Sequence, residues 1–425
     1  MEDAINLHLK EIYGVLRKNS PANISLMDGK AGIALFNFTY LQYYSACLQH
    51  NKIADLSQQQ FSGQRDEYLS HSVQELAEGV IAEPHPGFCN GKAGVNWLFA
   101  YLFKKDVLAA EDWQFLCEED VTLEEIALEM IETGNFDFLY GALGIAWYLL
   151  YTDNDHDLFF QDLFQMLALL EHKSATKNII PHFDPWKNQP VRDQVNLGLS
   201  HGITSILKFC LQCYVQNICA AKARSLAERI IDYLLAHANT PAQIRTHTLA
   251  QLPTHTGATI SYFPNYIYEA GNGAEQTPSR LAWCYGDLGI AYILYQSGIL
   301  FKKEEVTDFA LEVLIHTTKR TTDQETMVKD AGICHGCAGI AHMYNKLWHA
   351  THQPVFRTAC DLWMQRTLDM ATYADGMAGH KKYTGTEGVF ESTPALLDGI
   401  AGIGLVLLSY LTGDFSWDYC LMLNN

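Results

Sequence analysis

Short, strongly apolar segments recur along the chain, and each of them begins at a glycine. Examples are GIALFNFTYL, GVNWLFAYLF, GIAYILY and GIGLVLLSYL. These segments contain helix-forming residues and almost no charge, which predicts helices that are buried on most sides. Amphipathic stretches lie between them, which predicts a second set of helices with one exposed, charged face; the clearest are Asp120 to Glu132, Ala221 to Leu235 and Val306 to Thr317.

The apolar segments share a sequence repeat, Gly-x-x-Gly followed by Ile or Val. Six copies begin at Gly29, Gly91, Gly141, Gly286, Gly336 and Gly399, and a degraded seventh, with Ser205 in place of the second glycine, begins at Gly202. Consecutive first glycines are 50 to 84 residues apart, enough for a helical hairpin per repeat. Seven hairpins that close on themselves form an α/α toroid, because the last hairpin packs on the first. An open solenoid is the alternative.

Composition supports this all-α prediction and narrows the class of protein. Apolar residues make up 48% of the 425 residues and charged residues 18%, so the chain can bury a large core. No Pro/Ser-rich linker divides it, which predicts a single domain over residues 1–425 with seven repeats. The Thr/Pro/Tyr/Asn-rich run from Thr246 to Ser279 is predicted to be an extended loop.

Charge, apolar run length and cysteine content bear on partners and compartment. The formal net charge of −19 argues against nucleic acid as a partner, although it suits either a cationic peptide or simple solubility. No apolar run approaches the roughly 20 residues of a membrane helix, and the N-terminus does not have the pattern of a signal peptide. Eleven scattered cysteines are typical of a reduced intracellular protein. We therefore expect a cytoplasmic protein.

The residues just before each repeat glycine are predicted to lie at one rim of the toroid, because each enters a buried helix from its loop. Two residues before the glycine, repeat five has Cys284 and repeat six has Cys334, and His335 follows Cys334 directly. Consecutive repeats are neighbours in a ring, so these three side chains are expected to meet. Two thiolates and an imidazole form a three-ligand zinc set with an open fourth position, which is typical of catalytic zinc. The repeats therefore predict one Zn²⁺ per chain.

Repeats three and four add ionisable groups at the same rim. His201 directly precedes the glycine of repeat four, and Asp137 lies four residues before that of repeat three. Taken alone, Asp137 also fits a helix cap and His201 a buried core histidine. Their shared position with the metal repeats favours an acid–base role. Arg280 and Tyr285 are weaker candidates for orienting a substrate carbonyl or stabilising an oxyanion, and either could be structural.

Other cysteines admit different interpretations. Cys334-His-Gly-Cys337 is also a C-x-x-C pattern, typical of a redox pair or half of a zinc ribbon. Cys337 lies inside the Gly-x-x-Gly unit, where other repeats have Lys, Ala, Asp or Ile, which argues against a ligand role. Cys89 shares the position of Cys284 but belongs to repeat two, which is not adjacent to repeats five and six. Cys210 and Cys213 follow a helix start and are predicted to be small core residues.

The chain resembles the lanthionine synthetase C-like (LanC) family of class I lanthipeptide cyclases. The resemblance rests on the repeats and is most specific at Ser200-His-Gly202, Trp283-Cys-Tyr-Gly286, Cys334-His-Gly336 and Leu396-Leu-Asp-Gly-Ile-Ala-Gly-Ile403. It implies an α/α toroid, zinc bound by Cys284, Cys334 and His335, His201 and Asp137 as acid and base, and Arg280 and Tyr285 nearby. Ser205 and Cys337 depart from the family pattern, but neither replaces a predicted ligand.

The activity that this resemblance implies is zinc-dependent formation of thioether rings. A cysteine thiolate of a dehydrated precursor peptide adds to dehydroalanine or dehydrobutyrine and gives lanthionine or methyllanthionine. A dehydratase that makes the dehydro residues, and a transporter, are further implied partners. Two alternatives remain at this point: a zinc thiol-alkylating enzyme of the prenyltransferase type, and a non-catalytic zinc-containing scaffold or glutathione-binding protein.

Overall fold

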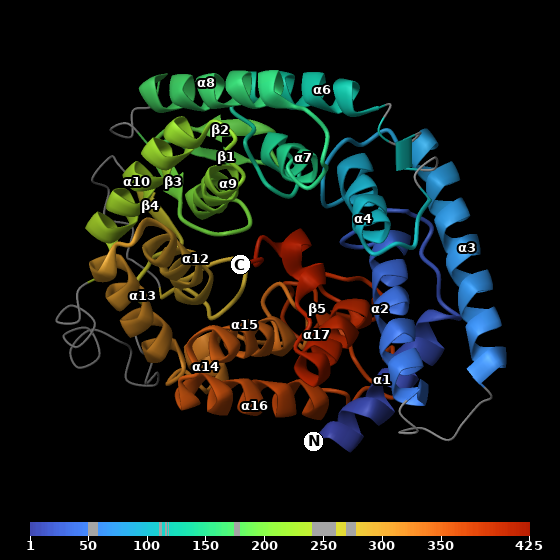
Figure 1. Ribbon diagram of the computed structural model, residues 1–425. Helices are drawn as coiled ribbons and strands as arrows, with labels where there is room; N and C mark the ends of the chain where they lie inside the picture. Colours follow the sequence, from blue (N-terminus) through green and yellow to red (C-terminus); the bar gives the residue numbers. More distant parts are fainter. Residues whose placement is uncertain are drawn as a thin grey trace. The chain divides into compact units, whose positions relative to one another are not determined.

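Seven helices begin directly after the first glycines of the seven repeats, and we call them the glycine-led helices (Figure 1). Most of their described residues are buried; in the shortest, every residue is buried. This agrees with their apolar sequences, since a helix without a polar face must be covered on all sides. The glycine-led helices are α2 (Lys30–Gln49), α4 (Lys92–Lys104), α7 (Ala142–Leu149), α9 (Ile203–Val215), α12 (Asp287–Phe301), α15 (Cys337–Thr351) and α17 (Ile400–Thr412).

A second set of helices buries one face and exposes the other. In α10 (Ala220–His237), for example, Ala223, Leu226, Ile230 and Leu234 are buried at helical spacing. The three amphipathic helices predicted from sequence are confirmed to within a few residues. The partly exposed helices are α1 (Glu2–Leu16), α3 (Gln58–Ala82), α6 (Asp120–Glu132), α8 (Asp157–Lys173), α10, α13 (Glu304–Thr317) and α16 (Pro354–Asp369).

This computed structural model describes residues 1–49, 58–109, 113–114, 117, 119–173, 179–239, 261–268 and 278–425. Most of the predicted loop from Thr246 to Ser279 lies outside these residues. The chain divides into two compact units: unit 1 is Met1–Cys117 with Lys329–Asn424, and unit 2 is Glu118–Val328 with Asn425. The single domain over residues 1–425 therefore stays a prediction.

Unit 1 contains both ends of the repeat array. Helix α2 of repeat one packs against α17 of repeat seven and against α4, while α1 packs on α17 and α15 contacts both α16 and α17. A 3₁₀ helix, η1 (Ser416–Leu421), follows α17 and contacts α4. The predicted packing of the last hairpin on the first is therefore confirmed within this unit. A short antiparallel pair, β5 (Lys382–Tyr383) and β6 (Phe390–Glu391), precedes α17.

Unit 2 contains repeats three to five and two small sheets that the helical pattern does not predict. Its glycine-led helices α7, α9 and α12 pack in chain order, α10 covers α9, and α13 covers α12. The short helix α14 (Asp323–Thr326) starts with a capping box at Thr322. Between α8 and α9, β1 (His182–Asp184) pairs antiparallel with β2 (Gln189–Val191), and β3 (Gln194–Asn196) pairs antiparallel with β4 (Tyr266–Tyr268).

Backbone crowding explains why the repeat retains glycine. Gly286 has a φ of 86°, a conformation that L-residues rarely adopt, and a Cβ there would collide with the carbonyl oxygen of Arg280. At the second glycine of repeat seven, Gly402, a Cβ would collide with the carbonyl oxygen of Leu396, three residues before the first glycine. The two glycines thus let each loop fold back onto the helix that it starts.

Backbone hydrogen bonds join the loops of consecutive repeats in a regular ladder. In three of these steps, the two N–H groups three and two residues before one repeat glycine donate to the carbonyl two residues before the next glycine. The same step closes repeat seven onto repeat one. The donor pairs and distances are Leu199 and Ser200 to Cys284 (2.9 and 3.2 Å), Ile333 and Cys334 to Leu397 (2.9 and 3.1 Å), and Leu396 and Leu397 to Met27 (3.0 Å each).

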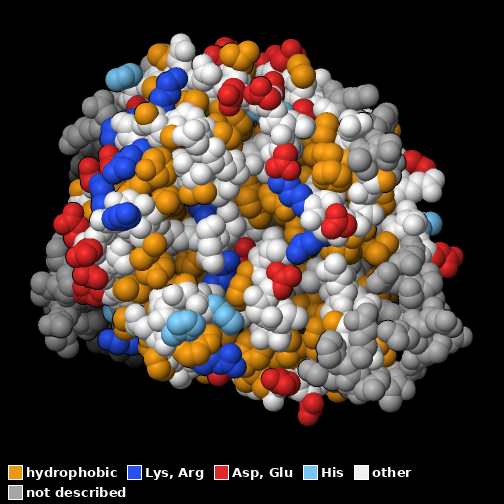
Figure 2. All heavy atoms as spheres, in the orientation of Figure 1, with side chains coloured by type: hydrophobic (Ala, Val, Ile, Leu, Met, Phe, Trp, Pro, Cys, Tyr) orange, Lys and Arg blue, Asp and Glu red, His pale blue; other side chains and the backbone are white. Residues whose placement is uncertain are grey.

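The surface carries mixed charge. On the face drawn in Figure 2, acidic and basic side chains are interspersed among apolar and neutral ones and do not gather into one basic area. Among the residues that the structure describes, no helix combines the length and the apolar character that crossing a membrane requires.

Candidate metal and proton-transfer site

A buried histidine–carboxylate pair lies in unit 2 at the starts of two glycine-led helices. The Nδ1 atom of His201 lies 2.6 Å from Oδ2 of Asp137, and both side chains are buried. The other carboxylate oxygen of Asp137 accepts a hydrogen bond from the backbone N–H of Tyr140 at 2.8 Å. Asp137 is therefore fixed in orientation. Its Oδ2 accepts the hydrogen bond from Nδ1–H of His201, which leaves Nε2 as the nitrogen that can exchange a proton with a substrate.

The carboxylate decides the protonation of His201. Burial by itself would lower the pKa of this imidazole, because it penalises the charged form, but the nearby Asp137 charge and its hydrogen bond raise the pKa above the ordinary value. Cys284 contributes to the increase. A protonated His201 is thus stabilised near neutral pH, which suits a group that donates a proton.

Three aromatic rings surround the imidazole. Tyr140 stacks on His201 with ring centroids 6.0 Å apart and an interplanar angle of 11°, and the ring of Tyr285 lies 6.2 Å away on a tilted plane. Tyr140, His201 and Tyr285 each directly precede the glycine of their repeat, so the repeat geometry places them in a row. The third ring is Trp186, in the turn between β1 and β2, at 5.1 Å.

The two weaker candidates, Tyr285 and Arg280, lie in the loop that leads to α12. The Tyr285 hydroxyl accepts a hydrogen bond from the Asn196 side chain at 3.1 Å and lies 3.4 Å from the Tyr266 hydroxyl. Burial raises the pKa of Tyr285 far above its ordinary value, so this phenol remains protonated and can donate. Arg280 is half-buried, and within the described part of the chain its guanidinium forms no hydrogen bond. Both remain candidates for contact with a substrate.

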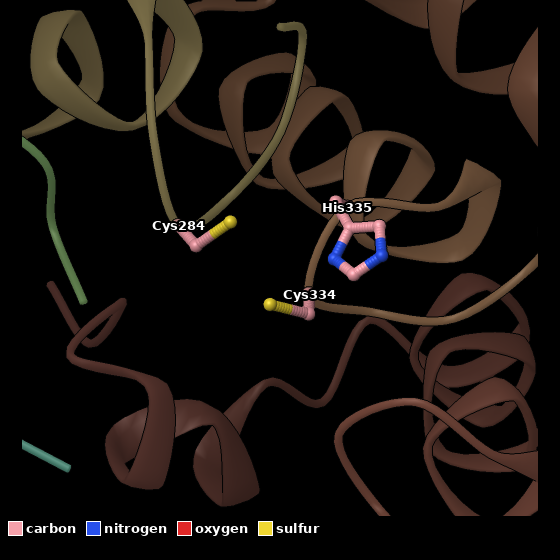
Figure 3. Close-up of side chains that lie close together, drawn as sticks. All are labelled: Cys284, Cys334 and His335. Carbon is pink, nitrogen blue, oxygen red and sulfur yellow. The ribbon is translucent and has the colours of Figure 1, made fainter. Parts of the chain in front are cut away.

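The predicted metal ligands come from the loops before α12 and α15. Cys284 is buried, with its carbonyl held by the ladder bonds from the His201 loop, whereas Cys334 and His335 are partly exposed. Each of Cys284, Cys334 and His335 has a potential ligand atom, and these three atoms lie within 4.8 Å of one another (Figure 3). Thiolate and imidazole donors at such spacing fit Zn²⁺ better than hard cations, which prefer oxygen ligands.

The remaining cysteines do not belong to this group. Cys337 is fully buried at the start of α15, and its sulfur lies 3.6 Å from the sulfur of Met370. Cys89 is buried, and its carbonyl accepts a bond from Met27 in the repeat-one loop. Cys210 and Cys213 are buried in α9, and burial raises the pKa of both thiols. The last two are therefore core residues, as predicted.

Sequence reasoning missed the part of this site that the small sheets supply. Trp186 lies in a hairpin of two three-residue strands, too short to show an alternating pattern. His182 lies on β1 and is buried beside the Tyr266 ring, and burial lowers its pKa to about 4. A Pro/Trp/Lys/Asn turn between β-compatible residues was the one available signal, at residues 185–188.

Fold and site together define an α/α repeat protein with glycine-led helices, a group of two cysteines and a histidine, and a buried histidine–carboxylate pair. The chain belongs to the lanthionine synthetase C-like protein family, whose model matches residues 20–422. Among solved structures it is similar to nisin cyclase, with a TM-score of 0.66 at 17% sequence identity over 99% of this chain and 97% of that chain. The α/α toroid predicted as the fold class is therefore confirmed.

Proposed function

We propose that this protein is a zinc-dependent lanthipeptide cyclase, which adds cysteine thiols of a dehydrated precursor peptide to dehydroalanine or dehydrobutyrine. The observation that carries the proposal lies within unit 2: the loop of the buried His201–Asp137 pair is hydrogen-bonded through its backbone to Cys284. A proton donor thus lies one loop away from a residue suited to bind a metal. Family membership and the similarity to nisin cyclase support the same activity.

The proposed zinc ligands are Cys284, Cys334 and His335. The donor set fits a catalytic rather than a structural zinc, because three protein ligands leave a fourth position for substrate. When bound, the ion would lower the pKa of the peptide thiol and so make a thiolate available at neutral pH. Cys337 is not proposed as a ligand, since it is buried against Met370.

The chain's own residues handle the proton. Attack of the peptide thiolate on the β-carbon breaks the C=C π bond and moves its electron pair onto the adjacent carbonyl as an enolate. Protonated His201 then donates its Nε2 proton to the α-carbon, while Asp137 keeps Nδ1 protonated and the ring oriented. The proton lost from the thiol replaces the one delivered, so ring formation leaves the peptide mass unchanged.

Arg280 and Tyr285 are proposed to act on the carbonyl that becomes the enolate. A charged guanidinium without a hydrogen-bond partner in the described chain, or a phenol that stays protonated, can stabilise negative charge on that oxygen. The implied partners are the dehydrated precursor peptide, a dehydratase that acts before this step, and a transporter. A cytoplasmic location suits both a reduced substrate thiol and reduced zinc ligands.

Elemental analysis of the wild type, Cys284→Ala and Cys337→Ala tests the metal and the activity together. We expect about one zinc per chain in the wild type and in Cys337→Ala, and a loss of zinc in Cys284→Ala. A dehydrated, cysteine-containing peptide should lose free thiol at constant mass with the wild type and Cys337→Ala, and not with Cys284→Ala. Wild-type protein without zinc would refute the ligand assignment, and zinc without thiol loss would favour the non-catalytic alternative.

A further inference from the structure

The most exposed aromatic side chain near the proposed proton donor is Trp186. Its side chain is 71% exposed, yet its ring centroid lies 5.1 Å from that of buried His201, with an interplanar angle of 60°. The other two aromatic rings found beside His201 in the described part of the chain, those of Tyr140 and Tyr285, are partly buried. A single exposed apolar side chain needs no special explanation, but this one lies against the imidazole of the proposed proton donor.

Hydrogen bonds fix the backbone of the turn that carries this tryptophan. One carboxylate oxygen of Asp184 accepts hydrogen bonds from the backbone N–H groups of Trp186 and Lys187, both at 3.1 Å, and so fixes the turn. Strand β1 packs against β3, and β3 leads directly into the loop of His201. The backbone that carries the indole is therefore placed next to the His201 loop by paired strands.

Further aromatic rings lie close to the imidazole. Tyr140 and Tyr285 flank His201 with centroids 6.0 and 6.2 Å from it. Tyr266 extends the row, since its ring lies 6.1 Å from that of Tyr285. We call Tyr140, His201, Tyr285 and Trp186 the ring platform. It offers flat π surfaces around one titratable nitrogen, which favours a planar ligand over a bulky aliphatic one.

We propose that Trp186 is a substrate-binding residue that stacks on the dehydrated residue of the peptide and holds its α-carbon at His201. The inference rests on the proposed function for the identity of the ligand. A dehydroalanine residue is planar, because its C=C bond is conjugated with the peptide carbonyl, and it is electron-poor. The electron-rich indole face is the natural partner for such a group. The ring platform would thus distinguish dehydrated from saturated residues before any bond forms.

Binding without turnover tests this directly. The probe is a short peptide with one dehydroalanine and with serine in place of cysteine, compared by calorimetry with the same peptide that has alanine in place of dehydroalanine. We expect the wild type to bind the dehydroalanine peptide about fivefold more tightly, a ratio typical of one aromatic stacking contact. Trp186→Ala should lose this preference, and Trp186→Phe should retain most of it.

The control variant is Leu158→Ala, which removes a comparably exposed apolar side chain, 77% exposed, at the start of α8 in the same unit. It should keep the preference and the wild-type kinetics. In cyclisation assays Trp186→Ala should raise KM with a smaller change in kcat, and its zinc content should be unchanged. An equal preference in the wild type and Trp186→Ala would overturn the inference.

The outcomes that would refute the cyclase proposal differ from those that would refute the role of Trp186. Wild-type protein that prefers the dehydroalanine peptide but never consumes the thiol of the cysteine-containing peptide would refute the cyclase proposal and leave the binding role of Trp186 intact. Wild-type protein that cyclises the peptide while Trp186→Ala matches it in KM, kcat and preference would refute the binding role of Trp186 and leave the cyclase proposal intact.

Discussion

Replacing Asp137 with asparagine tests the role of the buried histidine–carboxylate pair at almost constant volume. In the wild type, Oδ2 of Asp137 lies 2.6 Å from Nδ1 of His201, and the other oxygen accepts the N–H of Tyr140. In Asp137→Asn, the amide oxygen keeps the bond from Tyr140, so the NH₂ group faces Nδ1. Nδ1 must then accept a hydrogen bond, and the ring proton moves to Nε2.

The expected loss follows from both changes. Without the carboxylate, burial is opposed only by the smaller contribution of Cys284, so the pKa of His201 falls below the ordinary value and the imidazolium is lost at neutral pH. Removing a general acid slows a reaction by about 10²- to 10⁴-fold, which corresponds to about 3 to 5 kcal/mol in the barrier. Zinc content should not change, because Asp137 is not a proposed ligand.

The assay is a single-turnover time course of thiol loss at constant peptide mass, recorded from pH 6 to 9. The raised pKa of His201 predicts that wild-type activity falls on the alkaline side as the imidazolium deprotonates, and that Asp137→Asn moves this fall to lower pH. The matched control is Glu124→Gln, which changes a pair of the same 2.6 Å length at His156. Zinc-loaded Asp137→Asn that retains activity within about threefold of the wild type would refute the role assigned here.

Two further predictions concern stability. His380 lies 2.8 Å from His8 through their Nε2 atoms, and burial lowers its pKa to about 3, so the folded state binds fewer protons than the unfolded state below pH 6.5. The contribution of this group to stability is therefore fully present above pH 6.5 and decreases by about 1.4 kcal/mol for each unit that the pH falls below that value. In urea titrations at pH 7 and 5, His380→Gln should lose less unfolding free energy between the two pH values than the wild type. An equal loss in both proteins would contradict the prediction. Gly286→Ala forces a side chain into a φ of 86° against the Arg280 carbonyl and should cost about 2 kcal/mol or more, seen as a lower melting temperature than for Gly14→Ala, where a Cβ meets nothing.

Sequence predicted the glycine-led helices well because the constraint at each start is local. The helix must begin where the loop folds back, and a Cβ at positions such as Gly286 or Gly402 would collide with backbone. The same periodicity predicted that repeat one packs on repeat seven. Identity and spacing also selected His201 and Asp137, although no sequence pattern specifies the 2.6 Å contact between their side chains.

Sequence did not predict the features that depend on short strands or on distant residues. The hairpin that presents Trp186 has strands of three residues, held by the Asp184 turn and by packing on β3. The His8–His380 contact joins residues 372 positions apart, at no fixed place in the repeat. Such contacts arise from tertiary packing, and a single sequence carries no periodic signal for them.

The ladder bonds from Leu396 and Leu397 to Met27 have a consequence for biosynthesis. Unit 1 is assembled from both ends of the chain, so the first 117 residues emerge from the ribosome long before their packing partners in residues 329–424. Unit 2 is almost continuous in sequence, and its native contacts become available while translation proceeds. Contacts between distant segments are slow to form, so the apolar faces of the N-terminal helices stay exposed until residues 329–424 have been synthesised. We therefore expect nascent chains that are halted before residue 396 to depend on chaperones more than full-length chains do.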